Sequence, residues 1–310
     1  MRPAENQGEA VNTQNTEHRA QSTDNAGSAL IITLLIVTIL VALVVEFAYE
    51  VYIDTTSLSN WENAQKASLI AKSGQALSAR YLAELKDRKY TDIGEFTMPV
   101  EKDLGPNTQL ILRLEDENAK FNINSIIYAE NGKTNDKALL SLQRLLEYLE
   151  MDTKLALSIA DWIDPDSEPR LPDSEDNAKN SHLWNIEELR TVPGIEKSIF
   201  DKISPFITVF GDNLININTA RLPVIMSLSG DITETLAEQI IAYRESSPFE
   251  NRTYVQRVSG MESIGITIND RITEKSSSFR ITSRATVNEI TRIVESVTDT
   301  SNKIYFWREG

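Results

Sequence analysis

The sequence contains no Cys and only two His among its 310 residues. Without Cys the chain cannot form disulfides, thiolate zinc sites or iron–sulfur clusters, and it cannot use a thiol nucleophile. His18 lies in a polar N-terminal segment, so only His182 remains for imidazole chemistry. A Ser-His-Asp hydrolase and a two-His metal centre are therefore close to excluded, and we do not expect an enzyme.

Basic residues are also scarce, with 31 Lys plus Arg against 46 Asp plus Glu and a net charge of −15. Proteins whose main partner is a nucleic-acid backbone concentrate positive charge, so we expect no nucleic-acid partner. The chain is long enough for one large or two modest domains. With 41% hydrophobic residues it can form a core, so most of it should be folded.

The first 27 residues contain no Phe, Leu, Ile, Trp or Tyr. A segment of this composition cannot bury enough apolar surface to offset the entropy lost on folding. Residues 1–27 are therefore predicted to be a disordered leader. The segment carries two Arg against four acidic residues, so it has little of the positive charge that orients membrane helices.

An uncharged apolar run follows at residues 28–45. Its 18 residues would span about 27 Å as a helix, which is nearly the thickness of a hydrocarbon core. We predict a transmembrane helix at residues 28–47, with a buried soluble helix as the alternative. The small-residue junction lies before the run, at Gly27 and Ser28, so cleavage there would leave the apolar segment on the mature protein.

The helical pattern continues beyond the membrane segment. Apolar residues recur at steps of three, four or seven, which is typical of an amphipathic helix; they are Trp61, Ala64, Ala67, Ile70, Leu77, Tyr81 and Leu85. A hydrophobic stalk that runs into a half-buried helix is the shape of a type IV pilin-like subunit. The alternative is a signal anchor followed by an unrelated helix.

Alternating residues predict strands at both ends of the remaining chain. An early strand begins at residue 108, and three late strands are expected at 279–287, 290–297 and 303–307. The late strands should pair with the early one, which makes the helical segment between them an insertion into a sheet. We therefore predict an α+β fold: a pilin-like helix and first strands at residues 48–124, an all-α insertion at 125–276, and C-terminal strands at 277–310 of an antiparallel pilin-like sheet.

Part of the insertion, residues 219–260, resembles a helix-hairpin-helix, a motif that often binds DNA phosphates. Between residues 121 and 260 there are 13 Lys plus Arg against 22 Asp plus Glu. Because phosphate neutralisation dominates DNA affinity, a packing module is favoured over a DNA-binding one.

An acidic segment at residues 161–176 holds seven carboxylates and one Arg. So many carboxylates repel one another unless they are solvated or bridged, and oxygen ligands at this density suit calcium. Position 6 of an EF-hand count from Asp164 is Pro169 where that loop requires Gly, so a regular EF-hand is not expected. A solvated acidic loop is the alternative. Paired acids could also serve glycoside hydrolysis, but acids in one short loop do not face each other across a cleft.

Five stretches, in this order, resemble the type II secretion minor pseudopilin K family over residues 27–310. They are GSALIITLLIV at 27–37, EDENAKFNIN at 115–124, ADWIDPD at 160–166, EELRTVPG at 187–194 and ININTA at 215–220. The resemblance implies an inner-membrane protein with its globular part in the periplasm, whose leader is removed by prepilin peptidase between Gly27 and Ser28. It also implies a place at the pseudopilus tip, beside minor pseudopilins of the I and J types.

The family binds calcium in the inserted domain, so the resemblance implies a calcium site in the acidic segment. Its expected ligands are Asp161, Asp164, Asp166, Glu175 and Asp176. We therefore expect an assembly and initiation subunit for protein export across the outer membrane. The alternative is a membrane-anchored DNA receptor of the competence type, which also joins one membrane helix to a helix-hairpin-helix.

Overall fold

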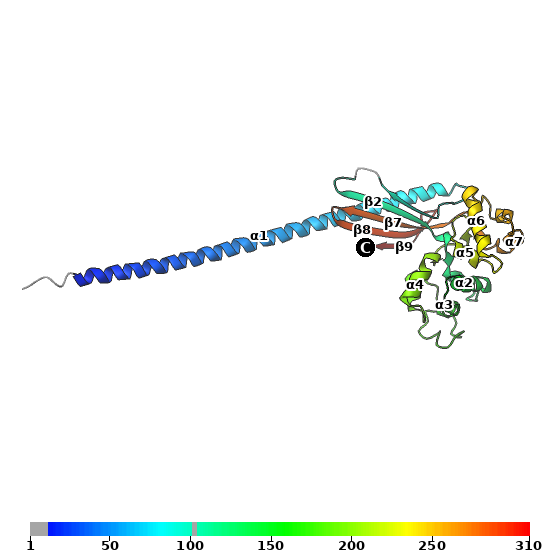
Figure 1. Ribbon diagram of the computed structural model, residues 1–310, viewed down its shortest axis with the longest axis horizontal. Helices are drawn as coiled ribbons and strands as arrows, with labels where there is room; N and C mark the ends of the chain where they lie inside the picture. The colour runs from blue at the N-terminus through cyan, green and yellow to red at the C-terminus, as the bar shows by residue number, and fades with distance from the viewer. Residues whose placement is uncertain (1–11, 101–103) are drawn as a thin grey trace, which may run out of the picture. The chain divides into compact units, whose positions relative to one another are not determined.

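A computed structural model describes residues 12–100 and 104–310, with side chains described from Gly27 onward. The chain forms two units, Met1–Asn63 and Ala64–Gly310, and the boundary falls within helix α1 (Asn12–Leu85; Figure 1). Residues 1–11 of the expected disordered leader lie outside the described part. Residues 12–27 form the first part of helix α1.

The first unit contains the apolar run expected to cross the membrane. Its helix is long and apolar enough to do so, with a mean hydropathy of 3.1 and none of that window buried. Two Thr interrupt the apolar residues, and their hydroxyls donate to backbone carbonyls one turn earlier: Thr33 to Leu30 at 2.9 Å and Thr38 to Leu34 at 2.8 Å. Both Thr hydroxyls of the run are thus satisfied within the helix, as a hydrocarbon environment requires.

The second unit contains a five-stranded antiparallel sheet in the order β1-β2-β7-β8-β9. Its strands are β1 (Glu95–Pro99), β2 (Thr108–Asp116), β7 (Ser278–Val287), β8 (Ile290–Asp299) and β9 (Ile304–Glu309). The predicted pairing of late strands with an early one is confirmed, because β7 pairs with β2 along its whole length. Strand β1 was not predicted.

The C-terminal part of α1 packs on one face of this sheet. Ala67, Ala71 and Leu82 are fully buried against sheet residues such as Leu112 and Ile281. The predicted apolar stripe is only partly right, because Trp61 is 63% exposed and Leu77 is 47% exposed. At Gly74 the helix lies so close to the sheet that a side chain does not fit. A Cβ at Gly74 would meet Ser283 Oγ at 2.3 Å and Leu112 Cδ2 at 2.7 Å.

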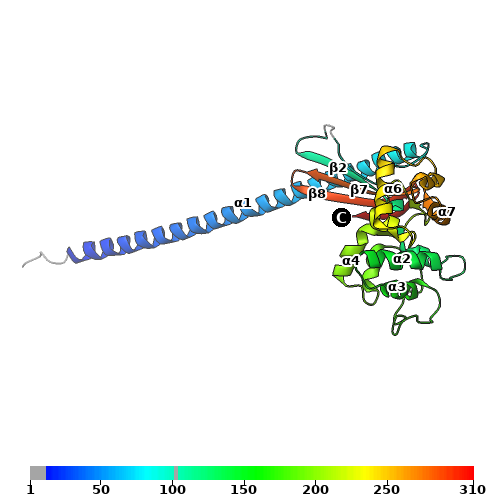
Figure 2. The same cartoon turned by 45° about the vertical axis from the view of Figure 1, so that its right-hand side comes forward.

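The helical insertion leaves the sheet after Asp116 and returns at Ser278, one residue from the partner of Asp116 in the β2–β7 ladder. Both views show its helices gathered at this end of the sheet (Figures 1 and 2). Its α-helices are α2 (Asp136–Tyr148), α3 (Leu155–Ile163), α4 (Lys197–Ile203), α5 (Leu222–Ser227), α6 (Glu234–Ser246) and α7 (Ile264–Ile268). The shorter elements are η1 (Glu117–Ala119), β3 (Phe121–Asn122), η2 (Ile123–Ile126), η3 (Ile186–Thr191), η4 (Ser204–Phe206), β4 (Ile207–Thr208), β5 (Ile215–Asn216), η5 (Arg252–Arg257) and β6 (Ile272–Thr273).

The insertion is built from two similar repeats. In the first, β3 pairs in parallel with β4, and in the second, β5 pairs in parallel with β6. The side chain of Asn124 donates to the carbonyl of Leu183 at 2.9 Å and accepts from its N–H at 2.8 Å. Asn218 makes the same two bonds with Phe249, at 3.0 and 2.8 Å. Each repeat is therefore closed by one Asn that pairs with the backbone of a distant residue.

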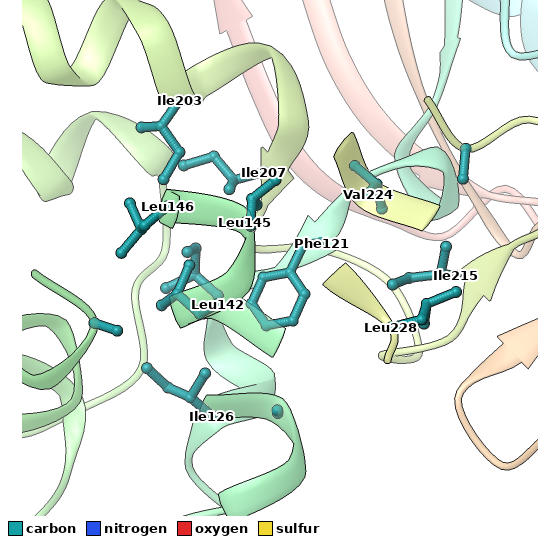
Figure 3. Close-up of a cluster of buried hydrophobic side chains, with 14 of the residues drawn as sticks. Phe121, Ile126, Leu142, Leu145, Leu146, Ile203, Ile207, Ile215, Val224 and Leu228 are labelled. Atoms are coloured by element: carbon teal, nitrogen blue, oxygen red, sulfur yellow. The ribbon is translucent and has the colours of Figure 1, made fainter. Parts of the chain in front are cut away.

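The two repeats share one hydrophobic core. It includes Phe121, Leu142 and Ile203 from the first repeat, and Ile215 and Val224 from the second (Figure 3). Within the insertion expected at residues 125–276, the longest helices are α2, α3 and α6. Helices α4 and α7 were not predicted, because segments of five to seven residues contain too little of the helical period to detect.

Candidate metal centre

The acidic loop interrupts the first repeat between α3 and Leu183. In the first repeat 19 residues, 164–182, separate the end of α3 from the Asn-bound residue, whereas the second repeat has only residues 247–248 in the same place. Three residues in the loop, Asp173, Asn177 and Asn180, have positive φ values of 63°, 61° and 51°. Asp and Asn tolerate this conformation better than other residues with side chains, which lets the loop fold back on α3.

Three carboxylates of this loop and of α3 lie together. Oxygens of Asp161, Asp164 and Glu175 are all within 4.8 Å of one another. Asp161 and Asp164 are three residues apart at the C-terminal end of α3, so they share one face of the helix. Both are fully buried. The C-terminal end of a helix carries partial negative charge, so this is an unfavourable place for two buried anions unless a cation compensates them.

Several oxygens around this cluster lack a hydrogen-bond partner. They are Oδ1 of Asp164, both Oε atoms of Glu175 and Oδ1 of Asn180. Buried polar atoms are almost always paired in folded proteins. Three of these acceptors belong to the group formed by Asp161, Asp164 and Glu175, and a hard cation would satisfy them.

Part of the negative charge is balanced by Arg170. Its Nη1 contacts the carboxylates of both Asp161 and Asp164, and its backbone N–H donates to Asp161 Oδ2 at 2.8 Å. Ser174 Oγ also donates to Asp161. All four hydrogen-bonding contacts therefore fall on Asp161 and on one oxygen of Asp164, and Glu175 receives none of them.

The titration of the cluster follows from this arrangement. Burial raises the pKa of the Asp164 carboxyl, and Arg170 offsets only part of the effect. Burial, together with the nearby Asp164, Asp161 and Asp166 carboxylates, raises the pKa of Glu175. An ion with two positive charges next to these carboxylates would favour their charged forms and so oppose both shifts.

The remaining predicted ligands lie at the rim. Asp166 is exposed, and its Oδ1 accepts from the N–H of Glu168 at 2.8 Å. Asp176 is exposed, and neither residue belongs to the three-carboxylate group. Asp166 is still close enough to affect the pKa of Glu175. His182 does not join the cluster; its Nε2 lies 3.2 Å from the carbonyl of Ile127.

The predicted processing site lies on the first turns of the apolar helix. Gly27 and Ser28 are exposed, and nothing lies within 4 Å of the position that a Cβ on Gly27 would take. Gly27 therefore has no packing role in the described structure, which leaves its small size available for recognition by another protein.

A second polar centre, which the residue patterns did not reveal, joins the insertion to the sheet. Asp116 at the end of β2 is buried and accepts from Ser276 Oγ at 2.6 Å, from Thr219 Oγ1 and from Asn216 Nδ2 at 3.2 Å. Burial raises its pKa to about 6 despite these donors. The stretch that contains Asp116 could only be found by its resemblance to a family.

Glu117, the next residue, is fully buried as well. It forms ion pairs with Lys120 and with Arg280 of β7, both at 2.9 Å, and accepts from Thr208 Oγ1 of β4. Burial acts to raise the pKa of Glu117, but Lys120 and Arg280 outweigh it and hold that pKa below the ordinary value. Asp116 and Glu117 thus bind the second and the first repeat, respectively, to the sheet.

A long N-terminal helix on an antiparallel sheet, with a two-repeat helical insertion that carries an acidic centre, defines a pilin-like subunit of an unusual kind. Two family models match the insertion, both described as type II secretion system protein K, at residues 119–212 and 215–274. The boundary between them falls between β4 and β5, where the first repeat ends. The chain belongs to the protein K family of type II secretion systems.

Curated relatives agree with this family. The chain is 29% identical over 120 residues to type II secretion system protein K of Dickeya chrysanthemi, covering 35% of this chain and 34% of that one. It is 24% identical over 222 residues to the protein of the same name from Pectobacterium carotovorum subsp. carotovorum, covering 63% of this chain and 66% of that one. The chain thus spans between about a third and two thirds of the length of these relatives.

A solved structure has the same fold. It is the crystal structure of the GspK–GspI–GspJ complex from the type 2 secretion system of enterotoxigenic Escherichia coli. The TM-score is 0.67 at 21% identity, and the match covers 83% of this chain and 99% of the other. The predicted α+β fold, with its pilin-like sheet and helical insertion, is confirmed.

Proposed function

We propose that this protein is a minor pseudopilin at the tip of the type II secretion pseudopilus, where it initiates assembly with minor pseudopilins of the I and J types. Family membership supports the pseudopilin role, and the matched solved structure is a complex of three such subunits. The apolar helix would anchor the chain in the inner membrane, and residues 64–310 would lie in the periplasm. The family also favours this role over the competence-type DNA receptor.

The observation that carries the tip position is Ile32. After cleavage between Gly27 and Ser28, Ile32 would be the fifth mature residue. Most pilin-like subunits have Glu there, which pairs with the N-terminus of the subunit above. Ile32 is uncharged and 58% exposed on α1, so it offers no partner for a charged N-terminus. A subunit at the tip has no subunit above it, so it needs no Glu to pair with the N-terminus of another subunit.

Filament labelling tests this position. A gold label attached through an engineered Cys in an exposed loop of residues 64–310 should decorate one end of pseudopili in cells that overproduce the major subunit. The same label on the major subunit should decorate the whole length. A protein K label spread along the filament would contradict the tip position.

Co-purification tests the partners. The full chain in detergent should retain the I- and J-type minor pseudopilins of the same secretion system, and cells that lack the chain should fail to export. An assembly subunit should also show no salt-sensitive binding of DNA and no hydrolytic activity that depends on His182 or on the acidic loop. Micromolar DNA binding would favour the receptor instead.

We propose further that the acidic loop binds calcium. Asp161, Asp164 and Glu175 would supply carboxylate ligands, and Asn180 Oδ1 is a candidate fourth oxygen. Calcium accepts six to eight oxygens in flexible geometry, whereas magnesium demands a regular octahedron. An irregular set of oxygens from a helix end and a loop therefore suits calcium better. Bound calcium would hold residues 164–182 on α3.

Thermal melts of the full chain in detergent test the site. A ligand that binds only the folded state adds about 2.7 kcal/mol to the free energy of unfolding at 100 times its dissociation constant. Calcium should therefore raise the melting temperature relative to EGTA, and magnesium should do so much less. Asp164→Asn should abolish the gain, whereas the exposed Glu168→Gln should retain it. A melt that calcium does not change would return the loop to a solvated acidic segment.

A further inference from the structure

Arg170 pairs with two of the three carboxylates that a bound ion would share. It is the only basic residue within residues 161–176, and its Nη1 contacts both buried carboxylates at the end of α3. Its Nη2 donates to Thr134 Oγ1 at 2.8 Å. The guanidinium therefore bridges the acidic centre and the segment that precedes α2.

This contact neutralises only one side of the cluster. Asp161 and one oxygen of Asp164 are paired with Arg170, while both oxygens of Glu175 and the other oxygen of Asp164 have no donor. A divalent ion placed among the three carboxylates would lie next to Nη1. Two cations at such a distance in a buried site repel each other strongly, so they cannot both hold Asp161 and Asp164.

We propose that Arg170 is a displaceable counter-cation, which pairs with Asp161 and Asp164 in the calcium-free protein and leaves them when calcium binds. The proposal rests on the calcium site proposed above. Because the ion pairs of Arg170 must break before calcium binds, they weaken the affinity of the loop for calcium. Arg170 thus sets the calcium concentration at which the loop becomes loaded, and loading releases Thr134.

The loop does not need Arg170 to stay packed. Pro165 contacts the segment before α2 independently: a Cβ at Gly132 would lie 2.4 Å from Pro165 Cγ, and Gly132 has a φ of 69°. Asn180 also fixes the far end of the loop, through its N–H to the carbonyl of Trp162 at 3.0 Å. The Arg170 side chain is 26% exposed, so it can move to solvent without crossing the core.

Calcium titrations of the full chain in detergent, by isothermal calorimetry, test the displacement. Arg170→Gln removes the competing charge, so its calcium dissociation constant should be at least tenfold lower than that of the wild type. Its melting temperature in EGTA should also be lower, because the three carboxylates then repel without a counter-cation. Arg190→Gln is the matched control; Arg190 pairs with Asp201 at 3.8 Å, away from the loop, and its loss should leave the dissociation constant unchanged.

A second variant avoids any risk to folding. Thr134→Val keeps the shape of the side chain and removes only the acceptor of Nη2, which weakens the hold on Arg170 in the calcium-free state. Its calcium dissociation constant should fall two- to threefold. Arg170→Lys keeps the charge and should stay within threefold of the wild type.

The outcomes separate this proposal from the calcium site itself. If the wild type binds calcium and Arg170→Gln binds it equally well or more weakly, Arg170 stays in the loaded site and the displacement is wrong. An unchanged dissociation constant in Thr134→Val would overturn it as well. If neither the wild type nor Arg170→Gln binds calcium, the proposed calcium site is wrong, and the proposed displacement of Arg170 is wrong as well.

Discussion

Removing the charge of Glu117 should loosen the connection between the sheet and the insertion. Glu117 has no exposed surface, and its partners Lys120 and Arg280 have side chains that are only 16% and 13% exposed. Glu117→Gln keeps the size of the side chain, but it leaves two largely buried cations without their anion. Arg280 would still hold Glu295 at 2.5 Å, which retains part of the network.

Breaking a buried ion pair by removing one partner costs about 3–5 kcal/mol. We take the lower end, about 3 kcal/mol, because Glu295 remains next to Arg280 and this network is more than one pair. For a unit of this size, each 1 kcal/mol lowers the melting temperature by about 2–4 °C, so the expected decrease is about 6–12 °C. The control is Glu250→Gln, whose pair with Lys89 has side chains 50% and 73% exposed and should contribute less than about 1 kcal/mol.

The effect should depend on pH in a defined direction. The folded pKa of Glu117 is lowered, so its contribution is complete above the ordinary value of 4.5 and is lost as the pH falls through the folded pKa. The difference between wild type and Glu117→Gln should therefore be full at pH 7 and shrink below about pH 4.5. Near-UV circular dichroism melts at both pH values measure it. If the free energy of unfolding of Glu117→Gln at pH 7 lies within about 1 kcal/mol of the wild-type value, the reasoning is refuted, since loss of a buried ion pair should cost more.

Three further changes test other parts of the molecule. Gly27→Leu should leave an uncleaved precursor in the membrane, because a peptidase must fit the backbone before the scissile bond. The control Gly27→Ala should be cleaved. A normal N-terminus at Ser28 in the Leu variant would contradict this prediction. Residues 50–310 should be soluble and should melt cooperatively without the apolar helix, and persistent aggregation would count against the two-unit division. Gly74→Ala should lower the free energy of unfolding by about 1–2 kcal/mol, because overpacking against Ser283 and Leu112 exceeds the helix propensity gained. The exposed Ser73→Ala is its control, and a stabilised Gly74→Ala would show that the helix can move away from the sheet.

Residue patterns were enough to predict the elements that are long and periodic. The apolar run at residues 28–45 carries no charge, and the alternation at 279–287 and 290–297 predicted most of β7 and β8. The insertion was also predictable, because strands far apart in sequence could only share a sheet if the helical segment between them left it. Self-comparison of the chain could have revealed the two repeats, since residues 121–124 and 215–218 share an Asn-Ile-Asn core.

The helix face that meets the sheet could be read from hydrophobicity only in part. Trp61 and Leu77 of the expected stripe are exposed, whereas its Ala67 is buried. Ala71 and Leu82 are also buried, although they were not part of that stripe. The distance between helix and sheet decides which residues fit, and that distance is a property of the packed structure. The same applies to Asp116 and Glu117, whose partners lie between 91 and 163 residues away, apart from nearby Asn118 and Lys120.

The acidic loop separates the two kinds of information most clearly. Composition by itself determined that residues 161–176 carry seven carboxylates and one Arg, which solvent or a cation must keep apart, and that only oxygen ligands are present. Spacing could not determine which carboxylates converge, because three Pro and three residues with positive φ decide how the chain folds back on α3. Tertiary structure brought Asp161, Asp164 and Glu175 together and left Asp166 and Asp176 at the rim. It also placed Arg170 on the cluster, since a long side chain can reach any of several acids and only the folded loop selects two of them.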